Sequence, residues 1–381
     1  GPLGIKMSNE SVQIPKCAAC WFGGQQRRPV EGKTMKSHND GILSANKLKP
    51  GDLVFSDQYV CSQPGKNFNS RGQEQRNLKY MGGTIFYDSA SKYVDMEHQI
   101  GFTASETITS KISFERRASY VGVDVKEYRT DNGVYTSKAF GASLEHFKQK
   151  ITHSGVGGHH HNGPAEATIK SITRRARIMM LHAAILWPDV SEKSLWPLAM
   201  QHAVHLHNHT PSSSTKLAPV EIWTQSQHSL NTVRNAHPWG CPVYVLQPRL
   251  QDGQKIPKWD PRSRRGQYLG YSPLHASTVG LVRNLRTERL SPQFHMVFDD
   301  WFETINCPTE TKPTEFYEKW EDLITLQAHT FDYFDEDADI PPLDKEWTEN
   351  DKPDDEKEEP KERNLEFEES TTSTEQTESE G

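Results

Sequence analysis

Long apolar runs are missing from this sequence of 381 residues, and so are a signal peptide and any internal repeat. A membrane-spanning helix needs about 18 or more consecutive apolar residues. We therefore expect a soluble protein that has no membrane partner. Cysteine is scarce as well. Its five residues are too few and too scattered for a disulfide framework, which predicts a reducing compartment.

Charge of both signs is present, but it is distributed unevenly along the chain. The net charge is −7. Residues 303–381 contain 27 acidic and 7 basic side chains, which leaves 24 acidic and 37 basic ones in residues 1–302. A basic body indicates a polyanionic partner, because contacts with phosphates release condensed counterions; an ordinary solvated surface is the alternative. Residues 306–381 are acidic and rich in Pro, Ser and Thr, so we expect them to be largely disordered.

Strand and helix patterns alternate along the first half of the chain and predict a mixed α/β domain. The expected strands lie at 52–57 and 122–131, and the expected hairpin at 82–98. The expected helices lie at 105–118, with Ser105 as the cap, at 137–150 and after Pro164. Further on, "CPVYVL", "GQYLGYS", "TVGLVRN" and "FHMVFDD" are four short apolar segments separated by Gly, Pro and Asp. Such closely spaced short strands are typical of a small barrel or sandwich.

Three carboxylates are expected where neighbouring elements meet. Asp57 ends the strand "LVFSD", Asp131 ends the strand "YRTD", and Glu166 lies in the first turn of the helix after Pro164. Glu166 alone could simply complement the helix dipole, but three clustered carboxylates repel one another unless cations separate them. Oxygen-only ligands suit Mg²⁺ or Mn²⁺, and two such ions about 3.5–4 Å apart catalyse in-line phosphoryl displacement.

The helix that carries Glu166 also carries a basic stripe. Lys170, Arg174 and Arg177 follow Glu166 at helical spacing, beside a stripe of apolar residues. We expect this basic stripe to hold a nucleic-acid backbone beside the metal ions. The three histidines at 159–161 could indicate a metal site, but the glycines before them favour a polar, mobile loop.

Several segments resemble integrases of copia-type LTR retrotransposons, which are fragments of a Pol polyprotein. The segments are "FSDQYV", "YRTDNGVYTSKAF", "ITHSGVGGHHHNGPAEATIKSITRRARIMML", "WPLAMQHAVHLHNHTPSSSTKLAPVEIW" and "GCPVYVL…KWDPRSRRGQYLGYSP". The resemblance as a whole extends over roughly residues 17–300. The spacing of 35 positions from Asp131 to Glu166 matches the Asp-Asp-Glu pattern of that family.

The resemblance implies a domain order. It places a remnant of a zinc-binding module and a linker at 1–45, a ribonuclease H-like core with a mixed five-stranded sheet and helices at 46–210, and a second linker at 211–236. A small barrel similar to Src-homology-3 (SH3) domains follows at 237–305, and an acidic, largely disordered tail at 306–381.

The resemblance also implies an activity. Asp57, Asp131 and Glu166 would be the catalytic residues and the ligands of two Mg²⁺ (or Mn²⁺) in a polynucleotidyl transferase. Such an enzyme joins the 3′ ends of element cDNA to target DNA by transesterification, and the same site could process those ends. The implied partners are double-stranded DNA (LTR ends and target) and further copies of the chain in a dimer or tetramer. The implied location is the nucleus, after assembly in virus-like particles or the cytoplasm.

Two departures from the family pattern concern DNA and zinc. Ala167 and Thr168 follow Glu166 where the family often has Arg or Lys. Cys17 and Cys20 supply half of a zinc site, but residues 1–16 contain no His. Zinc is therefore expected only if the missing His ligands are present in the full-length protein. The histidines at 159–161 would lie in the flexible active-site loop and meet the DNA.

The second half of the chain adds basic residues and an acidic tail. The basic edge expected on the barrel consists of Lys255, Lys258, Arg262, Arg264 and Arg265, together with Arg283, Arg286 and Arg289. It suits phosphates, with a solvated loop as the alternative. The tail could bind a basic host partner, shield the basic body or link to the next polyprotein segment. Alternatives for the whole chain are a non-catalytic DNA- or chromatin-binding domesticated protein, or a DDE transposase or nuclease of the same fold.

Overall fold

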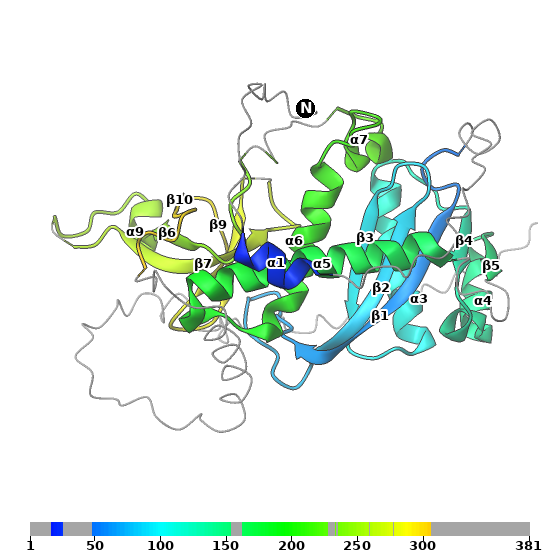
Figure 1. Cartoon of the computed structure of the whole chain (residues 1–381), viewed down its shortest axis with the longest axis horizontal. Helices are drawn as coiled ribbons and strands as arrows, with labels where there is room; N and C mark the ends of the chain where they lie inside the picture. Colours follow the sequence, from blue (N-terminus) through cyan, green and yellow to red (C-terminus); the bar gives the residue numbers. More distant parts are fainter. Residues whose placement is uncertain are drawn as a thin grey trace, which may run out of the picture. The chain divides into compact units, whose positions relative to one another are not determined.

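The computed structural model describes residues 17–25, 48–153, 162–227, 233, 235–258, 260–276 and 278–305. Several sequence predictions fall outside these residues: the region before Cys17, the histidines at 159–161 and the tail at 306–381. The described residues form two five-stranded sheets, each accompanied by helices (Figure 1).

The first sheet is mixed and has the strand order β3-β2-β1-β4-β5. Its strands are β1 (Val54–Gly65), β2 (Tyr80–Asp88), β3 (Val94–Gln99), β4 (Glu127–Thr130) and β5 (Lys150–His153). The first three form an antiparallel meander, whereas β4 pairs parallel with both β1 and β5. The mixed five-stranded sheet with helices that was expected is confirmed.

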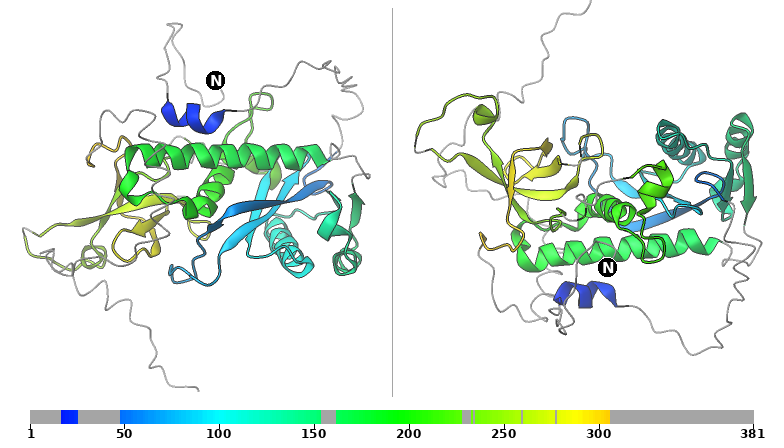
Figure 2. Two further views of the ribbon diagram at one scale, coloured as in Figure 1. Left: turned by 60° about the horizontal axis from the view of Figure 1, so that its bottom comes forward. Right: turned by 90° about the horizontal axis from the view of Figure 1, so that it is seen from above.

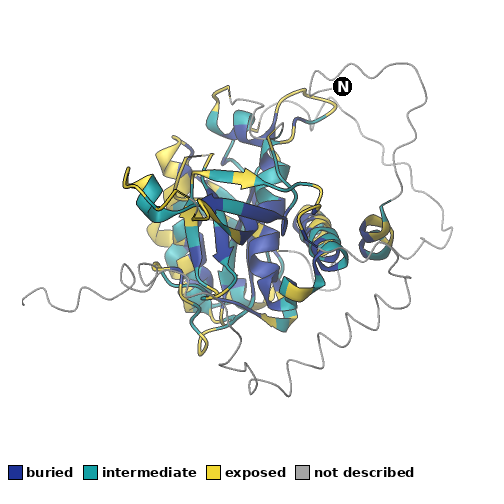
Figure 3. Cartoon of the chain, turned by 90° about the vertical axis from the view of Figure 1, so that its left-hand side faces the viewer, coloured by how far each residue is buried: buried dark blue, intermediate teal, exposed yellow. Residues whose placement is uncertain are grey.

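Helices cover both faces of this sheet, because its strands carry apolar residues on both sides. On one face, Phe55 and Ile85 pack in a cluster with residues of α5 (Gly163–Leu186) and α6 (Trp196–His209). On the other face, Val54 and Phe86 pack with α3 (Ala104–Tyr120) and α4 (Lys138–His146). Successive strand residues point to opposite faces. In Figure 3 buried residues gather in the interior, on strands and on a central helix.

The cap of α3 differs from the prediction. The side chain of Thr103, and not that of Ser105, accepts a hydrogen bond from the backbone N–H of Glu106 at 3.3 Å. Thr and Ser are both good N-caps, so "TASETI" offered two candidates within one turn. Among the described residues, none of the helices combines the length and apolar character needed to cross a membrane.

A short N-terminal helix, α1 (Ala18–Gly24), packs along α5 (Figure 2). Ala19 lies in an apolar cluster with Leu181 and Ala184. A Cβ atom added at Gly23 would lie 2.9 Å from Cγ1 of Ile178, so glycine permits the close approach of the two helices. The Cys-x-x-Cys segment is thereby held against the long helix of the core.

The expected linker at 211–236 contains a helix that packs into the core. Residues Pro219–Thr224 form α7, and the Glu221 carboxylate accepts from the backbone N–H of Ala218 at 2.7 Å. Trp223 is buried and stacks on Tyr93, with ring centroids 4.9 Å apart. The helix has six residues, too few for a helical period to show in the sequence.

The second sheet is antiparallel and has the strand order β10-β6-β7-β8-β9. Its strands are β6 (Pro242–Leu246), β7 (Ser263–Tyr271), β8 (Gly280–Asn284), β9 (Leu290–Gln293) and β10 (Met296–Phe298). The four expected apolar segments provide β6, β7, β8 and β10, but β9 was not predicted. Its sequence "LSPQ" contains Pro292, which a strand tolerates at the edge of a sheet, where β9 lies.

Buried ion pairs join the second sheet to the first. Lys66 Nζ lies 3.3 Å from Glu74, 2.6 Å from Glu192 and 3.5 Å from Glu288. The guanidinium of Arg283 pairs with Glu192 and, at 3.0 Å, with Glu288. Arg283 is buried, so its placement on a phosphate-binding edge is wrong. The segment "LVRN" gives no sign that a carboxylate of the core pairs with Arg283 and that this arginine is buried.

We predict that Glu192→Gln lowers the free energy of unfolding by about 3 kcal/mol, because it removes the nearer of the two carboxylates that the buried cations Lys66 and Arg283 share. Chemical denaturation of the variant and the wild type measures this. Glu145→Gln, on the exposed side of α4, is the matched control and should change stability by less than about 0.5 kcal/mol. Equal effects of the two substitutions would contradict a stabilising network.

Candidate active site

Parallel pairing of β1 and β4 brings Asp57 and Asp131 to neighbouring positions. Ser56 pairs with Thr130, and the next residue on each chain is the aspartate. The prediction that Asp57 ends its strand is wrong, because β1 continues to Gly65 by pairing with β2. Asp131 does follow the last residue of its strand. The two carboxylates therefore stand at the point where β4 ends beside a continuing β1.

A hydrogen bond ties the start of α5 to the same point of β1. The side-chain amide of Asn162 donates to the backbone carbonyl of Ser56 at 3.1 Å. Pro164 lies in the first turn of α5, where its fixed φ is preorganised for a helix, and Glu166 follows within that turn. Asn162 is a positioning residue that the sequence showed only as part of a helix-start signal.

The two other carboxylates influence the pKa of Asp57. Burial raises the pKa of Asp57 to about 6; the backbone N–H of Gln58 opposes this rise, and the charges of Glu166 and Asp131 add to it. Each aspartate also accepts a hydrogen bond at 2.8 Å from the backbone N–H that follows it. The charges of Glu166 and Asp131 thus both act on the carboxyl group of Asp57.

The carboxylates are not converged into a coordination shell. Across the part of the chain that the structure describes, no three or more His, Cys, Asp or Glu side chains are arranged so that they could hold a metal ion. Glu166 is exposed, and Asp57 and Asp131 are half-buried. The arrangement therefore supplies mutual repulsion and hard oxygen donors, while closure around a cation would require the side chains to move.

The basic stripe of α5 lines the same groove as the carboxylates. A pocket of about 590 Å³ is bounded by Asp57 and Glu166 and by Lys170, Arg174 and Arg177. The three basic residues are exposed. A linear anion lying along α5 would therefore meet positive charge directly beside the acidic cluster.

Helix α1 forms part of the rim of this groove. Arg177 Nη1 donates to the carbonyl oxygen of Gly23 at a long 3.5 Å, and Gln25 lines the groove. Burial and a hydrogen bond with Cys17 raise the pKa of the Cys20 thiol, while the charge of Arg174 opposes the rise. The two thiols are thus neighbours next to the basic stripe, and neither is in a disulfide.

The basic residues predicted for the second sheet lie in one segment of the chain, but they differ in burial and in their contacts. Lys255, Lys258 and Arg262 are exposed before and at the approach to β7. Arg264 is half-buried, and burial lowers its pKa to about 10. Arg265 lies over the ring of Trp187, with its guanidinium carbon 5.6 Å from the ring centroid. Neighbouring residues of a strand point to opposite sides, which the run "RSRR" does not reveal.

Two hydroxyl contacts of the residues that precede the aspartates, one buried and one partly buried, were not predicted. The Tyr135 and Ser56 hydroxyl oxygens lie 3.1 Å apart, directly before Asp57 in the chain. The Thr130 hydroxyl lies 3.1 Å from Nδ1 of His153, directly before Asp131. The sequence alone does not reveal this contact of His153, because it depends on the pairing of β4 with β5.

Comparisons with known proteins give low-identity likenesses to solved structures. No protein-family model and no curated protein matches the chain. The HTLV-2 integrase catalytic core domain in complex with magnesium, trimeric form, is 17% identical, with 46% of this chain and 99% of that one covered and a TM-score of 0.33. A simian T-cell lymphotropic virus intasome in complex with PP2A regulatory subunit B56 gamma is 16% identical, with 66% of this chain and 80% of that one covered and a TM-score of 0.37. The BIV integrase catalytic core domain is 14% identical, with 46% of this chain and 95% of that one covered and a TM-score of 0.33. Likenesses at this level carry no argument about this chain, whose fold and site stand on the geometry above.

Proposed function

We propose that this chain is a copia-type retrotransposon integrase, a fragment of a Pol polyprotein that joins the 3′ ends of element cDNA to target DNA. The observation that carries the proposal is the placement of Asp57, Asp131 and Glu166 around one point of β1, at the head of a basic groove along α5. The resemblance of the segments that contain these residues supports the same reaction.

The donor set fits divalent cations. The residues are oxygen donors only, and the pKa of Asp57 is raised to about 6 by burial and by two neighbouring carboxylates, a conflict that a bound cation removes. Asp57, Asp131 and Glu166 would hold Mg²⁺ or Mn²⁺. When bound, two such ions supply activation of the attacking oxygen and stabilisation of the leaving oxygen at a phosphodiester.

The remaining residues of the site bind the DNA and position the carboxylates. Lys170, Arg174 and Arg177 hold phosphates of the DNA along α5, because their exposed side chains border the groove. Asn162 fixes the first turn of α5 to β1 and so holds Glu166 over the aspartates. Water as the nucleophile gives 3′-end processing, and a 3′-hydroxyl gives strand transfer.

Further parts of the proposal concern assembly. The second sheet acts as an SH3-like DNA-binding barrel through Lys255, Lys258 and Arg262. The enzyme acts as a dimer or tetramer in the nucleus, because two DNA ends must be joined together. Zinc binds Cys17 and Cys20 only where the full-length protein provides the two missing His ligands.

A non-catalytic DNA-binding protein is the second candidate. It is favoured by the lack of a converged coordination group among the described residues. A transposase or nuclease of the same fold would use the same carboxylates on other DNA ends. An assay with labelled element-end DNA, a plasmid target and Mg²⁺ or Mn²⁺ separates these three possibilities.

We predict that Asp57→Asn, Asp131→Asn and Glu166→Gln each abolish strand transfer and leave duplex binding nearly unchanged, because each removes a metal ligand and no phosphate contact. Gel-based strand transfer and fluorescence anisotropy measure the two properties. Glu145→Gln on α4 is the control and should retain full activity. Substantial strand transfer by any of the three variants would remove that residue from the proposed site.

We predict that Asp57→Asn stabilises the metal-free protein at pH 8. The folded-state pKa of about 6 exceeds the ordinary value of about 3.9, so ionisation of Asp57 destabilises the fold as the pH rises between these values. Because the side chain is partly exposed, we expect a gain of about 1 kcal/mol at pH 8, and none at pH 4. Thermal melts at both pH values measure it; a gain at pH 4 as large as at pH 8 would contradict the electrostatic origin.

We predict that Lys170→Ala weakens duplex binding and reduces the slope of log affinity against log salt by roughly 0.9, the contribution of one phosphate contact. Arg175→Ala is the matched control, since Arg175 lies on the same helix and is exposed but does not line the groove. Binding titrations over a range of salt measure both slopes. If Lys170→Ala leaves the slope unchanged, this side chain does not contact the phosphates.

A further inference from the structure

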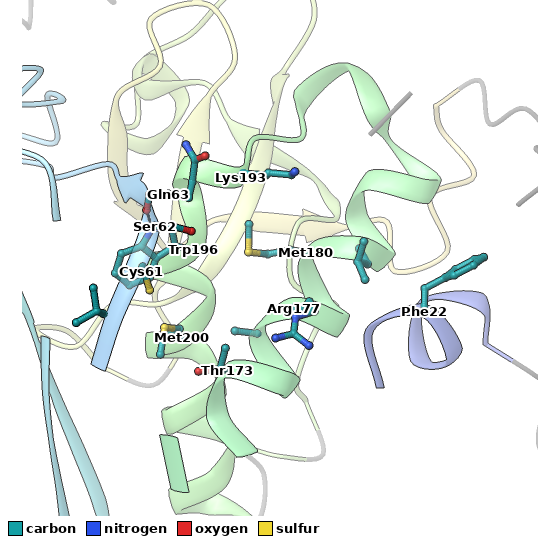
Figure 4. A pocket seen from close by; sticks show the side chains of 13 residues that line it. Phe22, Cys61, Ser62, Gln63, Thr173, Arg177, Met180, Lys193, Trp196 and Met200 are labelled. Carbon is teal, nitrogen blue, oxygen red and sulfur yellow. Dashed lines mark hydrogen bonds between the residues drawn. The ribbon is translucent and has the colours of Figure 1, made fainter. Parts of the chain in front are cut away.

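A second pocket extends the groove away from the carboxylates. It has a volume of about 520 Å³ and lies between β1, α5 and α6, with α1 at its rim. Figure 4 shows Cys61, Met180, Trp196 and Met200 around a common space. Val60, Cys61, Thr173 and Arg177 line both pockets, which makes the two continuous. The second pocket therefore offers an apolar floor beside the basic stripe.

The charged residues that line this pocket are all basic. Its thirteen lining residues include Arg177 and Lys193 and no acidic residue. The acidic side chains Asp57 and Glu166 border only the neighbouring pocket. The second pocket therefore suits an occupant that combines large apolar side chains with negative charge, because its lining is largely apolar and its charged residues are all basic.

We propose that residues 314–327 of this chain dock in this pocket. The segment, "TEFYEKWEDLITLQ", contains four acidic residues and one basic residue. Phe316, Trp320 and Leu323 are spaced as on one face of a helix. An apolar helix face laid into an apolar groove is a recurring mode of peptide recognition, and the acidic residues of the segment match the basic rim.

The last residues that the structure describes lie close to the pocket. Ile305 belongs to the same apolar cluster as Trp187, and the ring of Phe302 lies 5.6 Å from that of His182. Leu181, which lines the pocket, is six residues before Trp187 on α5, about 9 Å along the helix axis. Phe316 follows Ile305 by eleven positions, which can span up to about 36 Å, so the segment can reach the pocket.

Docking would oppose DNA binding. The segment would place its carboxylates beside Arg177, which also borders the carboxylate groove. It would therefore compete with a phosphate backbone for the same positive charge. This consequence rests on the proposed function, whereas the docking itself does not.

The experiment measures the alkylation rate of Cys61 in the full chain by peptide mass spectrometry. Cys61 is half-buried and lines the pocket, and burial raises the pKa of its thiol, so the reaction with N-ethylmaleimide is run at pH 8.5. Cys20 is exposed and does not line the pocket, so it serves as the reference thiol. A docked segment protects Cys61 and leaves Cys20 reactive.

The triple variant Phe316→Ser, Trp320→Ser and Leu323→Ser should raise the alkylation rate of Cys61 at least threefold and leave that of Cys20 unchanged. The matched control is Phe331→Ser, Tyr333→Ser and Phe334→Ser, which removes three aromatic side chains from another acidic stretch of the same tail. This control should react as the wild type does. Lys193→Glu, which reverses charge at the rim, should also expose Cys61.

Three results would overturn the proposal. Equal Cys61 rates in the wild type and the first triple variant would mean that the segment does not dock. Exposure of Cys61 by the control variant instead would assign the pocket to residues 331–334. Protection that is lost on tenfold dilution would assign it to a second copy of the chain. A wild type that protects Cys61 but lacks strand transfer would leave the docking intact and reject only the proposed function.

Discussion

Burial of the Asp57 carboxylate beside two other acidic residues is the constraint on which the geometry of the site depends. Burial raises the pKa of Asp57, and the charges of Glu166 and Asp131 add to the rise, so the ionised carboxylate costs free energy in the folded chain. The fold sustains that cost through packing on both faces of the first sheet, where each fully buried Leu, Ile or Phe contributes about 1.5–3 kcal/mol. Local repulsion held by a well-packed scaffold is typical of a site that acts on charged ligands.

The ion pairs around Lys66 determine how the two sheets fit together. They connect the loop after β1 with Glu192 and with the turn between β8 and β9. Burying charges is expensive, and paired charges recover the cost only when the geometry is good. Such a network adds little to stability as a whole, but it penalises every arrangement in which a charge loses its partner. It therefore fixes which parts of the two sheets meet, and apolar contacts shared by the two sheets add the stability.

Much of the fold could be predicted from sequence because local patterns carry it. The order of strands and helices, the three carboxylates and the basic stripe of α5 all follow from period, capping and spacing. What failed depends on contacts distant in sequence. Pairing with β2 extends β1 past Asp57, carboxylates of the core bury Arg283, and Trp223 packs against Tyr93. A single sequence shows residue types but not which distant residues will pair with them or bury them.

Helix α5 links the packing of the domain to its chemistry. Its apolar stripe, with Ile172 and Ala176, faces the sheet; its basic stripe borders the groove; and its last turns contact α1 and the second sheet. These roles occupy different faces of one rigid rod of 24 residues, so a shift of the rod relative to β1 would alter all of them together. The hydrogen bond from Asn162 to Ser56 resists such a shift at the end of α5 where Glu166 lies. The spacing between Glu166 and Asp57 is thus set by the packing of the whole helix as well as by the loop that precedes it.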